Sequence, residues 1–277
     1  MFRFDMLADM SDQRVCLTIA GLDPSGGAGI IADIKTFSAF GCFAAAVISS
    51  ITFQNTTGVF GTVHQDAASI RGQAEAVFDD LDIAAVKTGM LPTREAIEET
   101  ARILRARSVG KLVVDPVVRS TSGYDLIDDL ALKALIEHLF PLSLIVTPNL
   151  QEAERIAQMK IREPGDIETA AKLMLAMGAA NVLMKGGHRI NADDDKARDY
   201  LFRSDNTMHV FEADYVDSPA THGTGCTLAA AIAANLALGR EMLEAIQISK
   251  DLVTRGIRTS KGHGRGHSPI NIPPVAG

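Results

Sequence analysis

The chain has 277 residues, of which 47% are hydrophobic and 22% charged, and its formal net charge at pH 7 is −7. This composition is typical of a folded globular protein, and an acidic chain without a long Lys/Arg run argues against nucleic acid as a partner. The cysteines Cys16, Cys42 and Cys226 are odd in number, and their spacing predicts neither a disulfide framework nor a zinc site, which favours a reducing compartment.

No stretch has the features of a targeting or membrane segment. Residues 1–13 lack the continuous apolar core of a signal peptide. The longest apolar run, 228–238, is too short to span a bilayer and contains Asn235. We therefore expect a cytoplasmic protein that does not bind membranes.

Short apolar runs alternate with helical patterns along the chain, beginning with an apolar run, a glycine-rich turn and a helical pattern between residues 15 and 40. The expected strands are 15–20, 44–53, 83–86, 111–114, 144–147 and 182–184, followed by a two-stranded excursion at 197–203 and 207–213 around the turn 204–206. The expected helices are 30–40, 67–81, 93–107, 126–139, 150–159, 167–177, 228–238 and 241–258.

This alternation predicts an α/β fold with a doubly wound, mostly parallel sheet and helices on both faces. We expect a single domain over 1–277, with an N-terminal extension at 1–13 and an irregular tail at 262–277. Ligands of such folds bind beyond the carboxyl ends of the strands. The side chains expected at those ends are too polar to serve packing alone: Asp23, Gln54, Met90, Asp115, Asn149 and Lys185.

The segment 221–227 predicts an anion site. Gly223 and Gly225 flank Thr224 at the point where a buried, alanine-rich helix is expected to begin. Glycines let the backbone curl around a ligand, and the free N–H groups of a helix start converge on it, so the expected ligand is a phosphate. Cys226 falls in the first turn, where the helix dipole favours a thiolate.

Two other phosphate motifs are not supported. Residues 27–32 match the dinucleotide fingerprint in its alanine form, but no acidic residue lies between Asp33 and Asp66 to hold a ribose. The chain also lacks the Gly-Lys-Ser/Thr ending of a P-loop. NAD binding and a P-loop are therefore not expected.

Several polar residues allow two interpretations. Asn149 and Glu152 form a capping box at a helix start, or Glu152 helps to hold a hydrated Mg²⁺ together with Asp115. Asp115 precedes a proline and is also a plausible turn residue. Lys185 precedes two glycines and approaches a nucleotide phosphate, or it is solvated. Metal-ligand spacing is lacking among the histidines His188, His222, His263 and His267.

The glycine-rich opening 21–29, with 32–36, resembles that of the hydroxymethylpyrimidine/phosphomethylpyrimidine kinases of thiamine biosynthesis, members of the ribokinase-like superfamily. The resemblance covers nearly the whole chain from Val15. Its further motifs are 54–56, 87–91, 114–117, 147–149, 152–153, 185–188, 221–227, 262–264 and 269–271.

The resemblance implies ATP-dependent phosphorylation of 4-amino-5-hydroxymethyl-2-methylpyrimidine to its monophosphate and then its diphosphate. It implies four groups of site residues in addition to Cys226, which stands where sugar kinases of the superfamily place an aspartate base. They are Asp23, Ala28, Gln54 and Met90 for the pyrimidine; Asn149, Lys185, Gly187 and Thr221 for ATP; Asp115 and Glu152 for Mg²⁺; and Gly223, Thr224 and Gly225 for the anion hole. It also implies a homodimer, and it leaves a monovalent-cation requirement open.

The chain departs from the family pattern in places. Arg119 opens a loop where a lysine is expected, Thr88 replaces an apolar residue, and 189–197 is longer and more acidic than usual. A pyridoxal or pyridoxine kinase of vitamin B6 salvage is the alternative, because pyridoxal also carries a hydroxymethyl group on a six-membered aromatic ring. A pyrimidine-binding sensor without catalysis is a remote alternative, disfavoured by the joint presence of Asp115, Glu152, Lys185 and Cys226.

Overall fold

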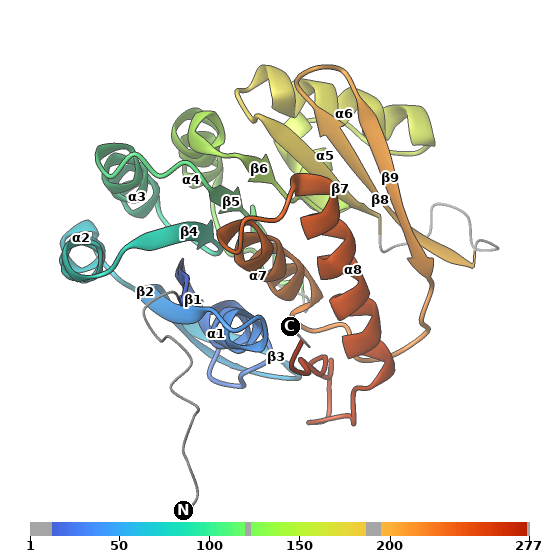
Figure 1. Cartoon of the computed structure of the whole chain (residues 1–277), viewed down its shortest axis with the longest axis horizontal. Coiled ribbons are helices and arrows are strands. Elements are labelled where there is room, and N and C mark those ends of the chain that lie inside the picture. Colours follow the sequence, from blue (N-terminus) through green and yellow to red (C-terminus); the bar gives the residue numbers. More distant parts are fainter. Residues whose placement is uncertain (1–12, 120–122, 187–194, 276–277) are drawn as a thin grey trace, which may run out of the picture.

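The computed structural model describes residues 13–119, 123–186 and 195–275. Within these ranges the strands form one nine-stranded sheet in the order β3-β2-β1-β4-β5-β6-β7-β8-β9 (Figure 1). The strands are β1 (Val15–Leu22), β2 (Phe43–Asn55), β3 (Gly58–His64), β4 (Ile83–Thr88), β5 (Leu112–Val114), β6 (Ile145–Val146), β7 (Asn181–Gly186), β8 (Lys196–Arg203) and β9 (Met208–Asp214). The six central strands are parallel, and β3, β8 and β9 pair antiparallel at the two ends. The predicted fold class is confirmed.

Helices cover both faces of the sheet. They are α1 (Gly29–Ala39), α2 (Ala67–Asp80), α3 (Arg94–Ala106), α4 (Asp129–Ala134), α5 (Leu150–Ala157), α6 (Pro164–Ala176), α7 (Thr224–Ala237) and α8 (Met242–Arg258). Because side chains alternate along a strand, adjacent residues enter different cores. Val86 packs into the cluster under α2 to α6, whereas Ala85 packs into the cluster under α1, α7 and α8.

The structure corrects the expected elements in a few places. Strand β3 was not expected, because its two glycines interrupt any apolar alternation. The expected excursion at 197–213 is a hairpin, but β8 pairs with β7 and so extends the main sheet. Strand β4 continues two residues beyond 86 and therefore includes Lys87.

The helix expected at 126–139 begins later and is not uniform. Asp128 caps it by accepting a hydrogen bond from the Ala131 N–H at 2.8 Å, so α4 starts at Asp129. The last part widens into the π-helix η2 (Leu135–Leu139) and tightens into the 3₁₀-helix η3 (Phe140–Leu142). Pro141 lacks a backbone N–H and cannot continue a helix.

Helix α7 is the central buried helix of its face. Its residues from Thr227 to Ala237 are all buried and mostly alanine, so it packs closely against α1, β4 and β5, with α8 beside it (Figure 1). The buried Asn235 is satisfied, since its amide donates to the Ala231 carbonyl at 2.8 Å and to Ser249 Oγ at 3.2 Å. This packing fixes the start of α7 at the carboxyl ends of the central strands.

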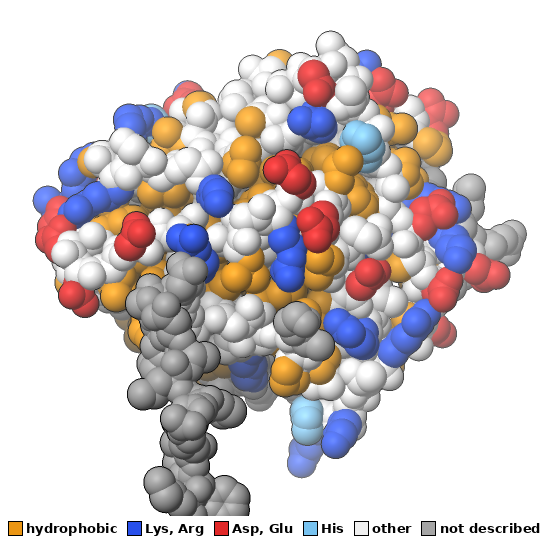
Figure 2. Space-filling view, viewed as in Figure 1, with side chains coloured by type: hydrophobic (Ala, Val, Ile, Leu, Met, Phe, Trp, Pro, Cys, Tyr) orange, Lys and Arg blue, Asp and Glu red, His pale blue; other side chains and the backbone are white. Residues whose placement is uncertain are grey.

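The surface carries intermixed charges, as the face in Figure 2 shows. Exposed ion pairs such as Lys196–Asp214 and Arg258–Asp214, at 2.7 and 2.8 Å, connect β8, β9 and α8. Exposed pairs contribute about 1 kcal/mol or less, so burial of the two cores dominates stability. Among the described residues, no helix combines the length and apolar character needed to cross a membrane.

The tail from 262 to 275 contains neither helix nor strand, but it is tied to the site loops. The His222 N–H donates to the Ser268 carbonyl at 3.2 Å, and the Ile270 N–H donates to the His222 carbonyl at 3.4 Å. The His267 N–H donates to the Thr56 carbonyl at 2.8 Å. The tail therefore supports both the end of β2 and the segment before α7.

Candidate active site

A row of polar side chains crosses the carboxyl edge of the sheet beneath α7. Each member lies two residues after a buried residue of the α7-side core, so alternation places it on that same face. The pairs of core residue and polar residue are Cys16 and Thr18, Ala85 and Lys87, Val113 and Asp115, Ile145 and Thr147, and Leu183 and Lys185. The strands thus deliver ionic groups to one place in an otherwise apolar interior.

Lys185 joins the two predicted acids. Its Nζ lies 2.9 Å from Asp115 Oδ1 and 3.8 Å from Glu152 Oε2, with only 12% of the lysine side chain exposed. The alternative that Lys185 is solvated is therefore wrong. Asp115 also accepts a hydrogen bond from Thr147 Oγ1 at 3.2 Å. Two carboxylates that already converge on one cationic group fit the oxygen ligands and positive charge of a Mg²⁺ ion.

The capping interpretation of Asn149 and Glu152 is confirmed. Asn149 Oδ1 accepts from the Glu152 N–H at 2.9 Å, and Glu152 Oε2 accepts from the Asn149 N–H at 2.8 Å. This capping box does not exclude a second role for Glu152, whose carboxylate is buried and turned toward Lys185. Burial raises the pKa of Glu152 to about 7, against the opposing attraction of Lys185.

At Asp115 and Lys185, attraction between opposite charges outweighs burial in setting the pKa. Burial alone would raise the pKa of Asp115, but Lys185 and Lys87 outweigh it and hold that pKa below its usual value. Burial alone would lower the pKa of Lys185, but Asp115 and Glu152 outweigh it and raise that pKa. Asp115 and Lys185 are therefore an ionised pair at neutral pH.

The predicted anion hole lies directly against this pair. Gly223 caps α7 with a left-handed φ of 81°, and a Cβ there would stand 1.8 Å from the Gly27 carbonyl oxygen. A Cβ on Gly225 would stand 3.1 Å from Lys185 Nζ. Thr224 Oγ1 donates back to the carbonyl of the exposed Thr221 at 3.1 Å. The start of α7 thus faces the lysine with no intervening side chain of its own.

Cys226 is half-buried in the first turn of α7. Burial raises the pKa of Cys226 to about 12, and Asp115 and Asp33 add to this rise. Lys87 and the Gly29 N–H at the start of α1 oppose it. The expected thiolate is not the predominant form in the free protein, because burial and the two carboxylates raise the pKa of the thiol.

On the opposite side, Asp23 organises the glycine-rich turn. Its carboxylate accepts hydrogen bonds from the Ser25 N–H and Oγ at 2.8 and 2.7 Å. It also accepts from the Ala28 N–H at 2.9 Å and lies 2.8 Å from His222 Nε2. Burial opposes ionisation, but His222 and Ser25 together hold the pKa of Asp23 below its usual range. These four partners occupy the acceptor positions of a carboxylate.

His222 connects this turn to the predicted pyrimidine residues. Its Nε2 lies 3.3 Å from the Gln54 side-chain nitrogen. Met90 is buried, and its sulfur lies 3.2 Å from a Cβ built on Gly21. The structure therefore brings Asp23, Ala28 and Gln54 together through one histidine, with Met90 against the preceding strand end.

Some of the predicted residues are not described by the structure. Gly187 and residues 120–122 lie outside the described residues, and so does most of the acidic stretch 189–197. Arg119 forms an exposed pair with Asp125 at 2.8 Å. Sequence reasoning missed His222 and Lys87 as members of the site. The sequence features that could have identified them are a histidine directly before the glycine loop and a lysine directly after the expected apolar strand 83–86.

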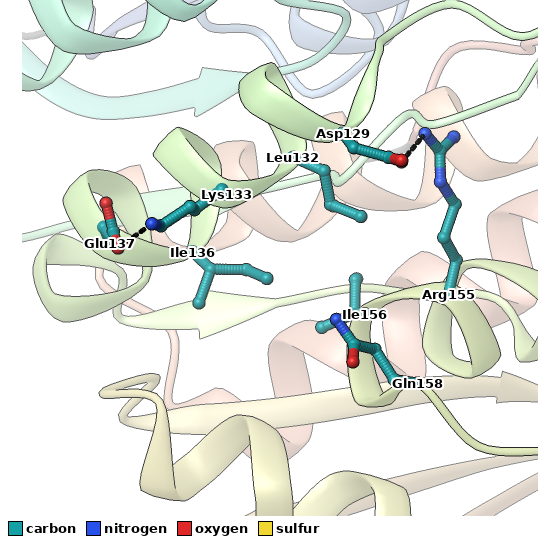
Figure 3. Close-up of a pocket in the computed structure, with 8 residues that line it drawn as sticks. All are labelled: Asp129, Leu132, Lys133, Ile136, Glu137, Arg155, Ile156 and Gln158. Atoms are coloured by element: carbon teal, nitrogen blue, oxygen red, sulfur yellow. Dashed lines mark hydrogen bonds and ion pairs between the residues drawn. The ribbon is translucent and has the colours of Figure 1, made fainter.

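A separate hollow lies away from these residues (Figure 3). Its volume is about 490 Å³, and Leu132, Ile136 and Ile156 from α4, η2 and α5 line it. Arg155 and Asp129 bridge its rim at 2.9 Å. None of the predicted site residues borders it. Among the described residues, no group of three or more His, Cys, Asp or Glu side chains is arranged to hold a metal ion.

Fold and site together define a phosphotransferase of the ribokinase-like superfamily. The solved ADP complex of Bacillus subtilis pyridoxal kinase is similar with a TM-score of 0.85 and 35% identity, covering 94% of this chain and 97% of that one. Phosphomethylpyrimidine kinase from Clostridium difficile is similar with a TM-score of 0.77 and 43% identity, covering 88% and 100%.

The sequence gives a narrower relationship. Hydroxymethylpyrimidine/phosphomethylpyrimidine kinase of Haemophilus influenzae is 40% identical over 262 residues, which cover 95% of this chain and 97% of the relative. The family model described as phosphomethylpyrimidine kinase matches residues 23–271. The chain belongs to the phosphomethylpyrimidine kinase family.

The close approach at Gly223 generates a first prediction. Gly223→Ala combines a strained left-handed backbone with a collision against the Gly27 carbonyl, so both glycine loops must shift. We expect kinase turnover to fall by about 10²-fold, the scale of a 1 Å misplacement of reacting groups. Gly239→Ala is the matched control, because its φ is 83° and, in the described part of the chain, no atom beyond its two chain neighbours lies within 4 Å of the added Cβ. It should lose about 1–2 kcal/mol of unfolding free energy and keep its turnover. Equal turnover losses in both variants would contradict this account.

Proposed function

We propose that this protein acts in the cytoplasm as an ATP-dependent kinase of thiamine biosynthesis. Its substrate would be 4-amino-5-hydroxymethyl-2-methylpyrimidine, which it phosphorylates to the monophosphate and then to the diphosphate. One observation carries the proposal: the start of α7 adjoins Lys185 at Gly225 and the glycine-rich turn at Gly223. A phosphate held there lies between an ionic side and a pyrimidine side. The names of the H. influenzae and C. difficile relatives support this substrate class.

On the pyrimidine side, we assign ring recognition to Gln54. A carboxamide offers one acceptor and two donor positions, which suit the amine and ring nitrogen of an aminopyrimidine. His222 lies beside this amide. Asp23 uses its oxygens within the protein, so its contribution is to shape the loop at Ala28 rather than to hydrogen-bond the ring directly. Met90 supplies apolar surface for the ring.

On the nucleotide side, we assign Lys185 and the α7 amides to the transferring phosphate. A lysine and a helix start stabilise charge that develops on phosphoryl oxygens. Asp115 and Glu152 would hold Mg²⁺, in part through water, with Asn149, Gly187 and Thr221 near the nucleotide. The metal, when bound, neutralises phosphate charge and orients the phosphoryl group.

Cys226 is the proposed general base of the first step. The substrate O–H bond breaks as the proton passes to the Cys226 sulfur, and the oxygen forms a bond to the γ-phosphorus while the bond to ADP breaks. A thiol with a raised pKa is ionised in only a small fraction of molecules. Its conjugate base is correspondingly stronger toward an alcohol proton, and such assistance contributes about 10²–10⁴-fold. In the second step the nucleophile is an ionised phosphate, so a base is needed less.

A pyridoxal kinase is the second candidate, because the B. subtilis structure of that name is similar along nearly its full length. A single phosphorylation of pyridoxal is one transfer, whereas the proposed pathway requires two. The number of phosphates added therefore separates the two candidates more sharply than binding does.

Product analysis tests the proposed function directly. With ATP, Mg²⁺ and the hydroxymethylpyrimidine, we expect mass spectrometry to detect the monophosphate first and the diphosphate later. A parallel reaction with pyridoxal is the control. Efficient turnover of pyridoxal alone would replace the proposal with the second candidate, and ATP binding without any product would favour a sensor.

The base assignment makes a step-specific prediction. Cys226→Ala should slow phosphorylation of the alcohol by about 10²-fold or more, the contribution of a general base, and slow phosphorylation of the monophosphate far less. Each step is measured separately by starting from the alcohol or from the monophosphate. If both rates fall by the same factor, Cys226 is not the base.

We also propose that the protein forms a homodimer through the β3 edge. Phe60 and Val63 on β3 are 68% and 49% exposed, and Phe53 on β2 is 54% exposed. An apolar edge strand favours pairing with another strand, and a second copy offers the same edge in a two-fold arrangement.

Phe60→Lys should shift the sedimentation coefficient from that of a dimer to that of a monomer. The matched control is Leu130→Lys on α4, which should leave the coefficient unchanged; the native Leu130 is 64% exposed. A wild-type monomer would refute this assembly.

A further inference from the structure

Lys87 is a fully buried lysine of the polar row, and it carries none of the roles proposed for the other site residues. Its side chain has no exposed area, and its Nζ pairs with Asp33 Oδ2 on α1 at 2.9 Å. Thr18 Oγ1 donates to the same carboxylate oxygen at 2.6 Å, while Asp33 Oδ1 has no hydrogen-bond partner among the residues that the structure describes. Replacing a buried ion pair by apolar residues of similar volume is often neutral or stabilising, so stability alone does not account for this pair.

The position of Lys87 in the polar row gives it a functional context. The charges from α1 to α5 alternate in sign: Asp33, Lys87, Asp115, Lys185 and Glu152. Lys185 is shared between Asp115 at 2.9 Å and Glu152 at 3.8 Å. Lys87 has a single ion-pair partner in the described residues, and that carboxylate is partly satisfied by Thr18. Lys87 is therefore the less neutralised of the two cations.

The packing of α1 and α7 brings Cys226 to this cation. The start of α7 lies against the start of α1, since a Cβ on Gly223 would stand 3.4 Å from the Cα of Ala28, which caps α1. Asp33 lies one turn beyond the first residue of α1, on the same helix face, and it holds Lys87. Helix α7 also packs on β4, the strand that carries Lys87. The thiol and the ammonium thus lie on the same side of the sheet with α1 fixing both.

We propose that Lys87 is a positioning residue for the phosphoryl transfer, whose ammonium group, held by Asp33, stabilises the negative charge on the Cys226 sulfur. The charge forms when the thiol releases its proton to solvent, and it is lost when the sulfur takes the proton of the substrate alcohol. This inference rests on the proposed role of Cys226 as the base. It gives a role to a cation that is buried on the same side of the sheet as Cys226.

The two partners act on Cys226 in opposite directions. The positive charge of Lys87 lowers the pKa of Cys226, and the negative charges of Asp115 and Asp33 raise it. Removing one charge therefore has the opposite consequence from removing the other, which loosening of the packing would not produce.

The test is the rate of iodoacetamide alkylation of Cys226 in the full chain, at one fixed pH below the thiol pKa, followed by peptide mass spectrometry. A change of one pKa unit alters the thiolate fraction tenfold, and the accompanying change in nucleophilicity reduces the rate effect to about threefold. We expect Lys87→Met to react about threefold or more slowly than wild type. Asp33→Asn should react faster by a similar factor. Cys226→Ala measures the background from the buried Cys16 and Cys42.

Folding is checked by circular dichroism, and Lys87→Met/Asp33→Asn removes both charges in case either single variant fails to fold. The double variant lacks both charges, so it should react faster than Lys87→Met and more slowly than Asp33→Asn. A double variant outside that interval, or the same direction of change in both single variants, would overturn the proposal. Alkylation requires no substrate, so these outcomes stand apart from the two-step activity test. If Cys226→Ala shows that another group is the base, the opposite shifts still report the electrostatic link but not its catalytic use.

Discussion

The alternation of side chains along parallel strands is the constraint on which this site depends. A strand that packs a core residue under α7 must point its second-next residue at the same face. Five strands follow this rule. The polar residues that come two positions after a core residue on each strand therefore form a row. Backbone pairing holds the strand ends at fixed separations, so Lys87, Asp115 and Lys185 cannot move apart. Their charges compensate one another because positive and negative groups alternate along the row.

The site also depends on the contact between two glycine-containing loops. Gly223 and Gly27 approach more closely than any side chain permits, and His222 stands beside this contact. Its ring pairs with Asp23, while its backbone is bound by the tail at Ser268 and Ile270. The first turn, the last strand-to-helix connection and the C-terminal tail therefore form one structure. A small displacement in any of them moves the anion hole relative to Gln54.

Local patterns predicted most of the sheet, the helices and the residues at the strand ends, because each depends on short-range periodicity or on a turn. Strand β3 was missed because its glycines leave no alternation to detect. Lys87 and His222 were missed for a different reason: their partners, Asp33 and Asp23, lie 54 and 199 positions away. The error at Cys226 has the same origin. The helix dipole can be predicted from a glycine-rich helix start, but burial and nearby carboxylates are tertiary properties, and here they determine the sign of the pKa shift.

The high pKa of Cys226 is compatible with the proposed chemistry because the two phosphorylations make different demands. A thiol that is mostly protonated carries no charge when the nucleotide binds, so the sulfur does not repel the phosphates. The same thiol is a strong base in its rare ionised form, which is what removal of an alcohol proton requires. In the proposed arrangement the buried Lys87 reconciles these demands, since it stabilises the anion without placing another ligand in the path of the substrate. Lys185 also interacts electrostatically with Cys226, but Asp115 and Glu152 already engage its ammonium group. The separation of tasks between two buried lysines follows from their different numbers of carboxylate partners.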